Sequence, residues 1–287
     1  MRDKRYTLDV RKNHWLMNHR SDHELRKFKH TAEDIVRDTR SIILTGVAQG
    51  FSYHLKPDGT FVTDIDLAVE DLIRSRLRAA FPDHGIVGEE RPETLAESDY
   101  RWIIDPVDGT CSLRHRIPLF GTLLALRHRD RSIVGVIDLP ALDRTYVAAS
   151  GLGAHCNGQQ IQLKDVASED AIDLEVIAVG EREQFVKRGK AAAFDSLMSS
   201  HASVRTYCDC FGHALAIEGC VGAMVDYNLR IWDVAATEVL IQEVGGKYVR
   251  VKANSPRDTT EARYDVVFGK PTVVDWVLSA LGAEADS

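Results

Sequence analysis

The sequence predicts a two-part α/β fold in which sheets are layered between helices, and three observations support this. Apolar residues recur at helical spacing over two long stretches before residue 81. Strand-like runs separated by charged turns follow from Leu119 to Ala149, as in an antiparallel meander. After Gly158 strand and helix patterns alternate, which is typical of an α/β unit. At 287 residues, 44% of them hydrophobic, the chain can form one large or two smaller domains.

The composition excludes several classes of protein. A net charge of -7 without a sustained block of Lys and Arg argues against a nucleic-acid binder. No apolar run approaches the ~20 residues that span a membrane, and residues 1–30 lack the apolar core of a signal peptide. Five cysteines form an odd set without C-x-x-C spacing, which predicts reduced thiols. We therefore expect a cytoplasmic protein that binds neither nucleic acid nor membranes.

The N-terminal part is expected to be helical after a flexible start. Residues 1–23 are basic and rich in His with little periodicity, so we interpret them as a flexible extension. Residues 24–48 have amphipathic helical spacing, and residues 56–59 (Lys-Pro-Asp-Gly) predict a turn. Thr63 then has the character of an N-cap for a helix that ends near Ala80.

Three acids in this second helix have different expected roles. Asp64 and Glu70 are interpreted as capping and solvated residues, the ordinary role of acids in a first helical turn. Asp66 can instead face a neighbouring site.

Two short apolar strands each end in carboxylates. The first is Ile86 to Gly88, followed by Glu89 and Glu90. The second, residues 101–110, is an apolar run that ends in Asp-Pro-Val-Asp-Gly-Thr, and we expect its sheet pairing to stop at Pro106. If the two strands are neighbours in a sheet, Glu89 lies beside the acids of the second strand.

The Asp105-x-x-Asp108-Gly109-Thr110 turn suggests metal and phosphate chemistry. Two convergent carboxylates repel each other strongly unless a cation or a proton lies between them. Gly109 lets the backbone approach a ligand closely, and amides that follow Asp108 can contact an anion if a helix begins there. A solvated turn is the simpler alternative for an isolated motif of this kind.

The second half, residues 151–287, is predicted to be a separate α/β unit after an N-terminal half of residues 24–150. Within it, Asp233 lies at the start of a helix that ends at Gly245-Gly246. Capping is the simplest explanation for Asp233 when it is considered alone.

Three motifs together resemble the magnesium-dependent, lithium-sensitive phosphatases typified by inositol monophosphatase. They are Gly88-Glu89-Glu90, the Trp102 to Thr110 segment, and Trp232-Asp233-Val234-Ala235-Ala236, and the resemblance covers about residues 24 to 280. It implies an αβαβα layered sandwich, hydrolysis of a phosphate monoester, two or three Mg²⁺ ions and a homodimer. These are expectations from the resemblance and not from residue spacing.

The resemblance also implies roles for single residues. Glu89, Asp105 and the carbonyl of Val107 would hold one Mg²⁺, while Asp105, Asp108 and Asp233 would hold a second. Catalytic roles in orienting and deprotonating water would fall to Glu89 and to the pair Thr110 and Asp66. The amides of Gly109 and Thr110 would hold the phosphate. Glu90 would support the metal ligands or help to bind a third, weaker ion. Lys56 either lends positive charge near the site or is a solvated lysine.

The substrate is expected to be histidinol phosphate. Residues 205–213 and 118–123 resemble the histidinol-phosphatase branch of this family, and Asp226 matches a position where members carry a substrate-binding acid. Asp209 and Asp226 would favour an ammonium group, and Arg205 belongs to the same substrate segment. The sequence departs from the branch at Cys208 and at Arg114 and Arg116, which either bring charge to the rim or are surface residues. Inositol 1-phosphate or another sugar or polyol phosphate is the alternative substrate. A catalytically silent member that binds metal and phosphate is the alternative to an enzyme.

Overall fold

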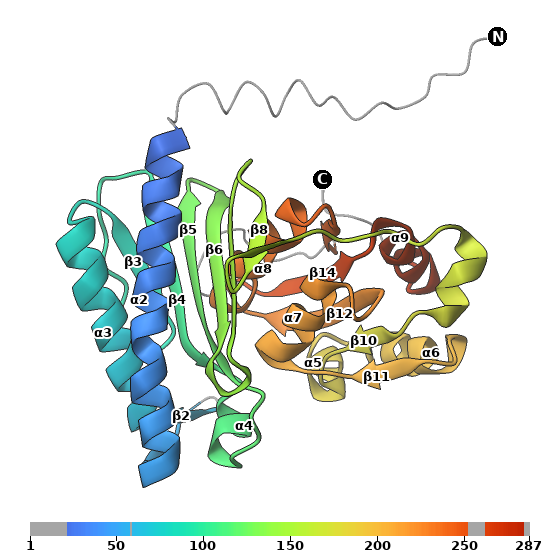
Figure 1. The fold of residues 1–287 in the computed structure, drawn as a ribbon. Helices are drawn as coiled ribbons and strands as arrows, with labels where there is room; N and C mark the ends of the chain where they lie inside the picture. The colour runs from blue at the N-terminus through green and yellow to red at the C-terminus, as the bar shows by residue number, and fades with distance from the viewer. Residues whose placement is uncertain (1–21, 58, 252–261, 284–287) are drawn as a thin grey trace.

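The protein has five layers, αβαβα, in a computed structural model that describes residues 22–57, 59–251 and 262–283. Helices α2 and α3 cover one sheet, α7 and α8 lie between the two sheets, and α5, α6 and α9 cover the second sheet (Figure 1). The predicted fold class is confirmed. The expected extension over residues 1–23 lies outside the described residues except for its last two, which begin the first helix.

The first half consists of two long helices, a small hairpin and a meander. Its elements are α2 (Asp22–Gln49), β1 (Tyr53–Leu55), β2 (Phe61–Thr63), α3 (Asp64–Ala80), β3 (Gly85–Gly88), β4 (Tyr100–Asp108), α4 (Thr110–Arg114), β5 (Gly121–His128), β6 (Arg131–Leu139), β7 (Arg144–Ala149), β8 (Ala154–Cys156) and β9 (Gln159–Ile161). Strands β3 to β9 form a seven-stranded sheet in chain order. The sheet therefore continues past residue 150, where we expected the first half to end.

The second half alternates strands and helices, as its pattern predicts. Its elements are β10 (Ile177–Val179), α5 (Arg182–Lys187), α6 (Ala191–Ser200), β11 (Val204–Thr206), α7 (Asp209–Glu218), β12 (Ala223–Leu229), α8 (Ile231–Glu243), β13 (Lys247–Arg250), β14 (Tyr264–Gly269) and α9 (Pro271–Ala280). Its sheet has the order β11-β10-β12-β14-β13. Among the described residues, no helix is long and apolar enough to cross a membrane.

Close backbone packing fixes α8 between the two sheets. Gly135 in the centre of β6 lies against this helix, and a Cβ added there would come within 2.5 Å of the carbonyl oxygen of Ala236. The first turn of α8, with Asp233, is thereby held at the junction between the two halves. Glycine at position 135 is a requirement of this approach, since no side chain fits the space.

One ion pair ties α2 to the central strand of the first sheet. The Arg40 guanidinium donates to both oxygens of Asp138, which is fully buried on β6, and to the hydroxyl of Thr145 on β7. Without this guanidinium, a buried carboxylate would lose its counter-ion. The pair therefore matters more for stability than the exposed pairs along α2.

We expect Arg40→Ala to lower the free energy of unfolding by about 3 kcal/mol, because it leaves Asp138 buried and unpaired. Urea denaturation at neutral pH measures this. Arg37→Ala is the matched control on the same helix, because Arg37 is exposed, pairs with Glu33 and acts on Asp138 only weakly and at a distance, so it should cost about 0.5 kcal/mol or less. Equal losses in the two variants would contradict the assignment.

Candidate metal centre and active site

Pairing of β3 with β4 brings the first two acids together. The strands run parallel with Gly88 opposite Ile104, and the amide of Glu89 donates to the carbonyl of Ile104 at 3.2 Å. Glu89 therefore follows its strand at the same level as Asp105. The prediction that these strands are neighbours is confirmed.

A bulge in β4 places Asp105 and Asp108 on one side of the strand. The register with β5 shifts between Asp105, opposite Leu123, and Asp108, opposite Gly121. An odd separation normally directs two side chains to opposite faces, and one extra residue in the strand reverses this. The expectation that pairing stops at Pro106 is wrong, because Pro106 lies inside the bulge, where no ladder N–H is required.

The third carboxylate comes from the other half of the chain. Oxygens of Asp105, Asp108 and Asp233 lie within 4.8 Å of one another, an arrangement that can hold a metal ion. Asp233 also caps α8, because its Oδ2 accepts the Arg230 amide at 2.6 Å. Capping and site formation are thus not alternatives for this residue, because the carboxylate that caps the helix is also one of the three in the cluster.

The cluster is electrostatically unsatisfied by protein groups. Burial, followed by repulsion from Glu89 and Asp108, raises the pKa of Asp105 well above its usual range. Burial and then Glu89 raise the pKa of Asp233 to about 8. Asp105 Oδ1 is buried and has no hydrogen-bond partner among the described residues. An all-carboxylate set with an unpartnered buried oxygen fits a hard divalent cation.

A lysine neutralises the edge of this cluster. Lys56, from the hairpin of β1 and β2, donates to Glu89 Oε1 at 2.8 Å and to Glu90 Oε1 at 2.5 Å. Burial, with repulsion from Glu89, still raises the pKa of Glu90 to about 7. Lys56 thus contacts Glu89, the acid that follows β3 and lies at the level of Asp105.

Thr110, at the start of α4, lies near Asp66 in the first turn of α3. The Thr110 hydroxyl lies 3.1 Å from the Val107 carbonyl and 3.5 Å from Asp66 Oδ1. Asp66 Oδ2 accepts the Thr63 amide in the capping box of α3. Burial raises the pKa of Asp66 to about 6, although the Thr63 hydrogen bonds oppose this.

Glu70 is not the solvated residue that we expected from its position in the helix. It is fully buried beneath the loop that follows β3, where it pairs with Arg74 at 2.7 Å and accepts the Glu90 amide at 2.8 Å. A Cβ on Gly88 would come within 2.1 Å of Glu70 Oε1. Glu70 thus supports the backbone that carries Glu89. Asp64 does not cap the helix, whose N-cap is Thr63; its Oδ2 accepts the amide of Ser52, in the segment before β1.

Backbone from the second half closes the site around Asp108. The amide of Cys210, in the first turn of α7, donates to Asp108 Oδ2 at 2.5 Å. Asp209, the preceding residue, has a positive φ of 57°, and its Oδ2 lies 3.2 Å from where a Cβ on Gly109 would be. The predicted substrate acid and the predicted phosphate-binding glycine are therefore adjacent.

A second acidic group surrounds Asp209. Burial, followed by Asp108, Asp226 and Glu181, raises the pKa of Asp209 well above its usual range. Asp226 is buried and faces His213, whose Nε2 lies 3.4 Å from Asp226 Oδ2. Sequence reasoning missed Glu181. It directly follows Gly180 at the end of β10, so the strand-end rule that found Glu89 could also have found it.

Two predicted features do not join the carboxylates. Arg205 is exposed on β11, and its Nη1 donates to the carbonyl of the preceding Val204. Among the described residues no contact links it to Asp209 or Asp226. Arg114 lies 4.1 Å over the ring of Phe61 and so packs α4 against the hairpin that carries Lys56.

Comparison with known proteins defines the class. The family model described as the inositol monophosphatase family matches residues 24–281. The chain therefore belongs to this family of metal-dependent phosphomonoesterases, in agreement with the carboxylate cluster.

Similar proteins within this family are named for different substrates. A histidinol-phosphatase from Chlorobaculum parvum is 38% identical over 191 residues, which is 67% of this chain and 73% of the relative. An inositol-1-monophosphatase from Mesorhizobium japonicum is 32% identical over 207 residues, which is 70% of this chain and 76% of the relative. The structure of the extragenic suppressor protein suhB from Bartonella henselae matches with a TM-score of 0.78 at 24% identity, covering 88% of this chain and 97% of that one. This last match shows the fold alone.

Asp105→Asn should abolish metal binding while raising the stability of the metal-free protein. Removing one charge relieves repulsion among buried carboxylates, so we expect a gain of about 1 kcal/mol in the free energy of unfolding. Urea denaturation of metal-free protein measures it. Asp99→Asn is the control, since Asp99 precedes the same strand but is exposed and paired with Arg129. A loss of stability in Asp105→Asn would argue against the electrostatic account.

Proposed function

We propose that this protein hydrolyses a small phosphate monoester with Mg²⁺, and that its substrate is histidinol phosphate. The single observation that supports the metal chemistry most strongly is the buried, unpartnered Oδ1 of Asp105 at the centre of the acidic cluster. Protein groups leave this charge uncompensated, which is costly unless a cation is a normal component of the site.

The positions of the acids suggest which residues would hold each Mg²⁺ ion. We assign Asp105, Asp108 and Asp233 to one Mg²⁺, and Glu89, Asp105 and the Val107 carbonyl to a second, with Asp105 shared. Mg²⁺ favours such oxygen ligands. When bound, the ions would lower the pKa of a water molecule and neutralise charge on the phosphate. We propose that two or three Mg²⁺ ions bind per site.

The protein's own groups would orient the attacking water and accept its proton. Thr110 and Asp66 form a hydroxyl and carboxylate pair that can hold a water molecule between α3 and α4. In the metal-free protein burial raises the pKa of Asp66 to about 6, so this carboxylate is more basic than an exposed one. Glu89 is the other acid that we assign to the water, and Lys56 keeps a positive charge near it.

The phosphate group would lie at the start of α4. Gly109 has a φ of 82° and is the N-cap of this helix, so the amides of Gly109 and Thr110 can turn toward a ligand. A Cβ at Gly109 would approach the Leu119 carbonyl to 2.9 Å, which leaves no room for a side chain. This supports the assignment of Gly109 and Thr110 to the phosphate.

The acids beside the phosphate position support a cationic substrate. Asp209 lies next to Gly109, and the charges of Asp226 and Glu181 act on it. An ammonium group would offset this accumulation of negative charge, whereas a neutral polyol offers only hydrogen bonds. The 38% identity to a histidinol-phosphatase points the same way.

Inositol 1-phosphate or another sugar phosphate is the second candidate, because a relative of 32% identity is an inositol-1-monophosphatase. A catalytically silent protein that binds metal and phosphate is the alternative to an enzyme. A homodimer and a cytoplasmic location are further parts of the proposal, and both rest on the sequence.

Phosphate release should require Mg²⁺ and should be fastest with histidinol phosphate. A panel of histidinol phosphate, inositol 1-phosphate, fructose 1,6-bisphosphate and 3′-phosphoadenosine 5′-phosphate, with and without Li⁺, tests this. EDTA and Asp105→Asn should each reduce release by about a thousandfold or more. No release from any ester would leave the silent alternative. If the protein hydrolyses other esters but hydrolyses histidinol phosphate poorly, only the substrate assignment is wrong.

Substrate preference should depend on Asp209. We expect Asp209→Asn to raise KM for histidinol phosphate by about tenfold, because it removes a charge that faces the ammonium group. The KM for inositol 1-phosphate should change by less than about threefold under the same conditions. Glu181→Gln, at the rim of the same group, should produce a smaller shift in the same direction. Parallel changes for both substrates would refute a charge-selective pocket.

A further inference from the structure

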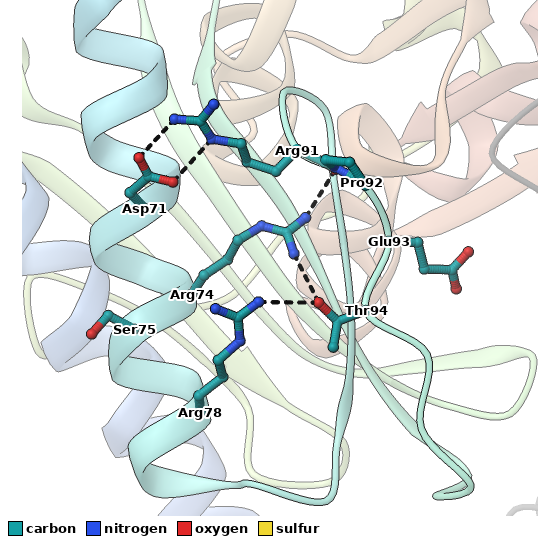
Figure 2. A pocket seen from close by; sticks show the side chains of 8 residues that line it. All are labelled: Asp71, Arg74, Ser75, Arg78, Arg91, Pro92, Glu93 and Thr94. Carbon is teal, nitrogen blue, oxygen red and sulfur yellow. Dashed lines mark hydrogen bonds and ion pairs between the residues drawn. The ribbon is translucent and has the colours of Figure 1, made fainter.

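An open groove lined by arginines lies between α3 and the segment that follows β3 (Figure 2). Its volume is about 530 Å³. Arg74 and Arg78 reach it from α3, while Arg91 and Thr94 belong to the opposite wall. None of these side chains has a part in the chemistry proposed above.

The charges in the groove are unequally compensated. Arg91 is held by two hydrogen bonds to Asp71, at 2.9 and 2.7 Å, and Arg74 pairs with Glu70. Arg78 forms no ion pair with any residue that the structure describes. Glu93, another acid of the wall, lies 3.5 Å from Arg101 on β4.

Two guanidinium groups converge on one neutral atom. Arg74 Nη1 and Arg78 Nη2 each donate to the Thr94 hydroxyl at 3.3 Å, which is long for a hydrogen bond to a charged donor (Figure 2). Glu70 already compensates the charge of Arg74, whereas Arg78 has this neutral hydroxyl and only the more distant charge of Asp71. An anion at this point would accept shorter, charge-assisted hydrogen bonds from both.

We propose that this groove binds a small organic anion that carries a phosphate group or several carboxylates. Planar guanidinium groups match the paired oxygens of both chemistries. The volume is within the range of small-molecule sites and exceeds the needs of a bare inorganic ion. Binding here is independent of the proposed hydrolysis.

The groove is connected to the metal centre through one side chain. Glu70 accepts from Arg74 with Oε1 and from the Glu90 amide with Oε2. An anion that attracts Arg74 competes with Glu70 for this guanidinium. We therefore expect binding of an anion in the groove to change the hydrogen exchange of the segment from Gly88 to Thr94.

The test measures binding to the full-length protein after its metal is removed on a chelating resin, in a buffer of low ionic strength. Citrate and inorganic phosphate are the probes, and calorimetry gives their affinities. Without metal the catalytic carboxylates repel anions, so this condition separates the groove from the active site. Arg78→Ala is the test variant and Arg78→Lys its conservative partner. Arg76→Ala is the matched control, because Arg76 is on the same helix but pairs with Asp38.

We expect at least one probe to bind without metal, with affinity reduced about tenfold by Arg78→Ala and unchanged by Arg76→Ala. Arg78→Lys should retain part of the affinity, and exchange should slow in residues 88–94. Tighter binding of phosphate or of citrate identifies which of the two chemistries the groove prefers. Binding that appears only with Mg²⁺, equal losses in Arg76→Ala and Arg78→Ala, or no binding up to about 10 mM of either probe would overturn the proposal.

Discussion

Repulsion among buried carboxylates is the constraint on which the rest of this structure depends. Asp105, Asp108 and Asp233 lie within 4.8 Å of one another, and Glu89 adds a fourth charge to the same region. Nothing in the packing of an ordinary core would keep such groups together, since each raises the free energy of the others. The fold supplies what holds them: a paired strand, a bulge and two helix starts, each fixed by backbone hydrogen bonds.

The surrounding backbone shows how the fold keeps these groups in place. A parallel pair of strands sets Glu89 beside Asp105, the bulge turns Asp108 to the same side, and the α8 cap holds Asp233. Each of these arrangements is local and stiff. The cost of assembling the acids is thereby met by packing elsewhere, such as the contact of Gly135 with α8 and the buried pair of Arg40 and Asp138.

Much of the fold and of the site could be predicted because acids at strand ends are visible in a sequence. Glu89, Asp105 and Asp108 are found in this way, the α/β class follows from periodicity, and the layered αβαβα arrangement follows from the family resemblance. The bulge at Pro106 could not be predicted, because register depends on the partner strand. Glu70 was misassigned for a similar reason: its burial depends on a loop that crosses its helix. Glu181 was missed although it follows the end of a strand, and its nearness to Asp209 depends on the pairing of β10 with β11. The groove between α3 and the segment after β3 has no signature in the sequence, since its arginines converge only in three dimensions.

The amide of Cys210 that donates to Asp108 has a consequence for dissecting this protein. It joins a carboxylate of the first half to the backbone of the second, at the same junction to which α8 brings Asp233. Neither half contains a complete site. A fragment that ends before α7 would retain most of the recognisable motifs and would still lack both this hydrogen bond and the third carboxylate. A fragment that keeps the complete carboxylate cluster must therefore include both sheets.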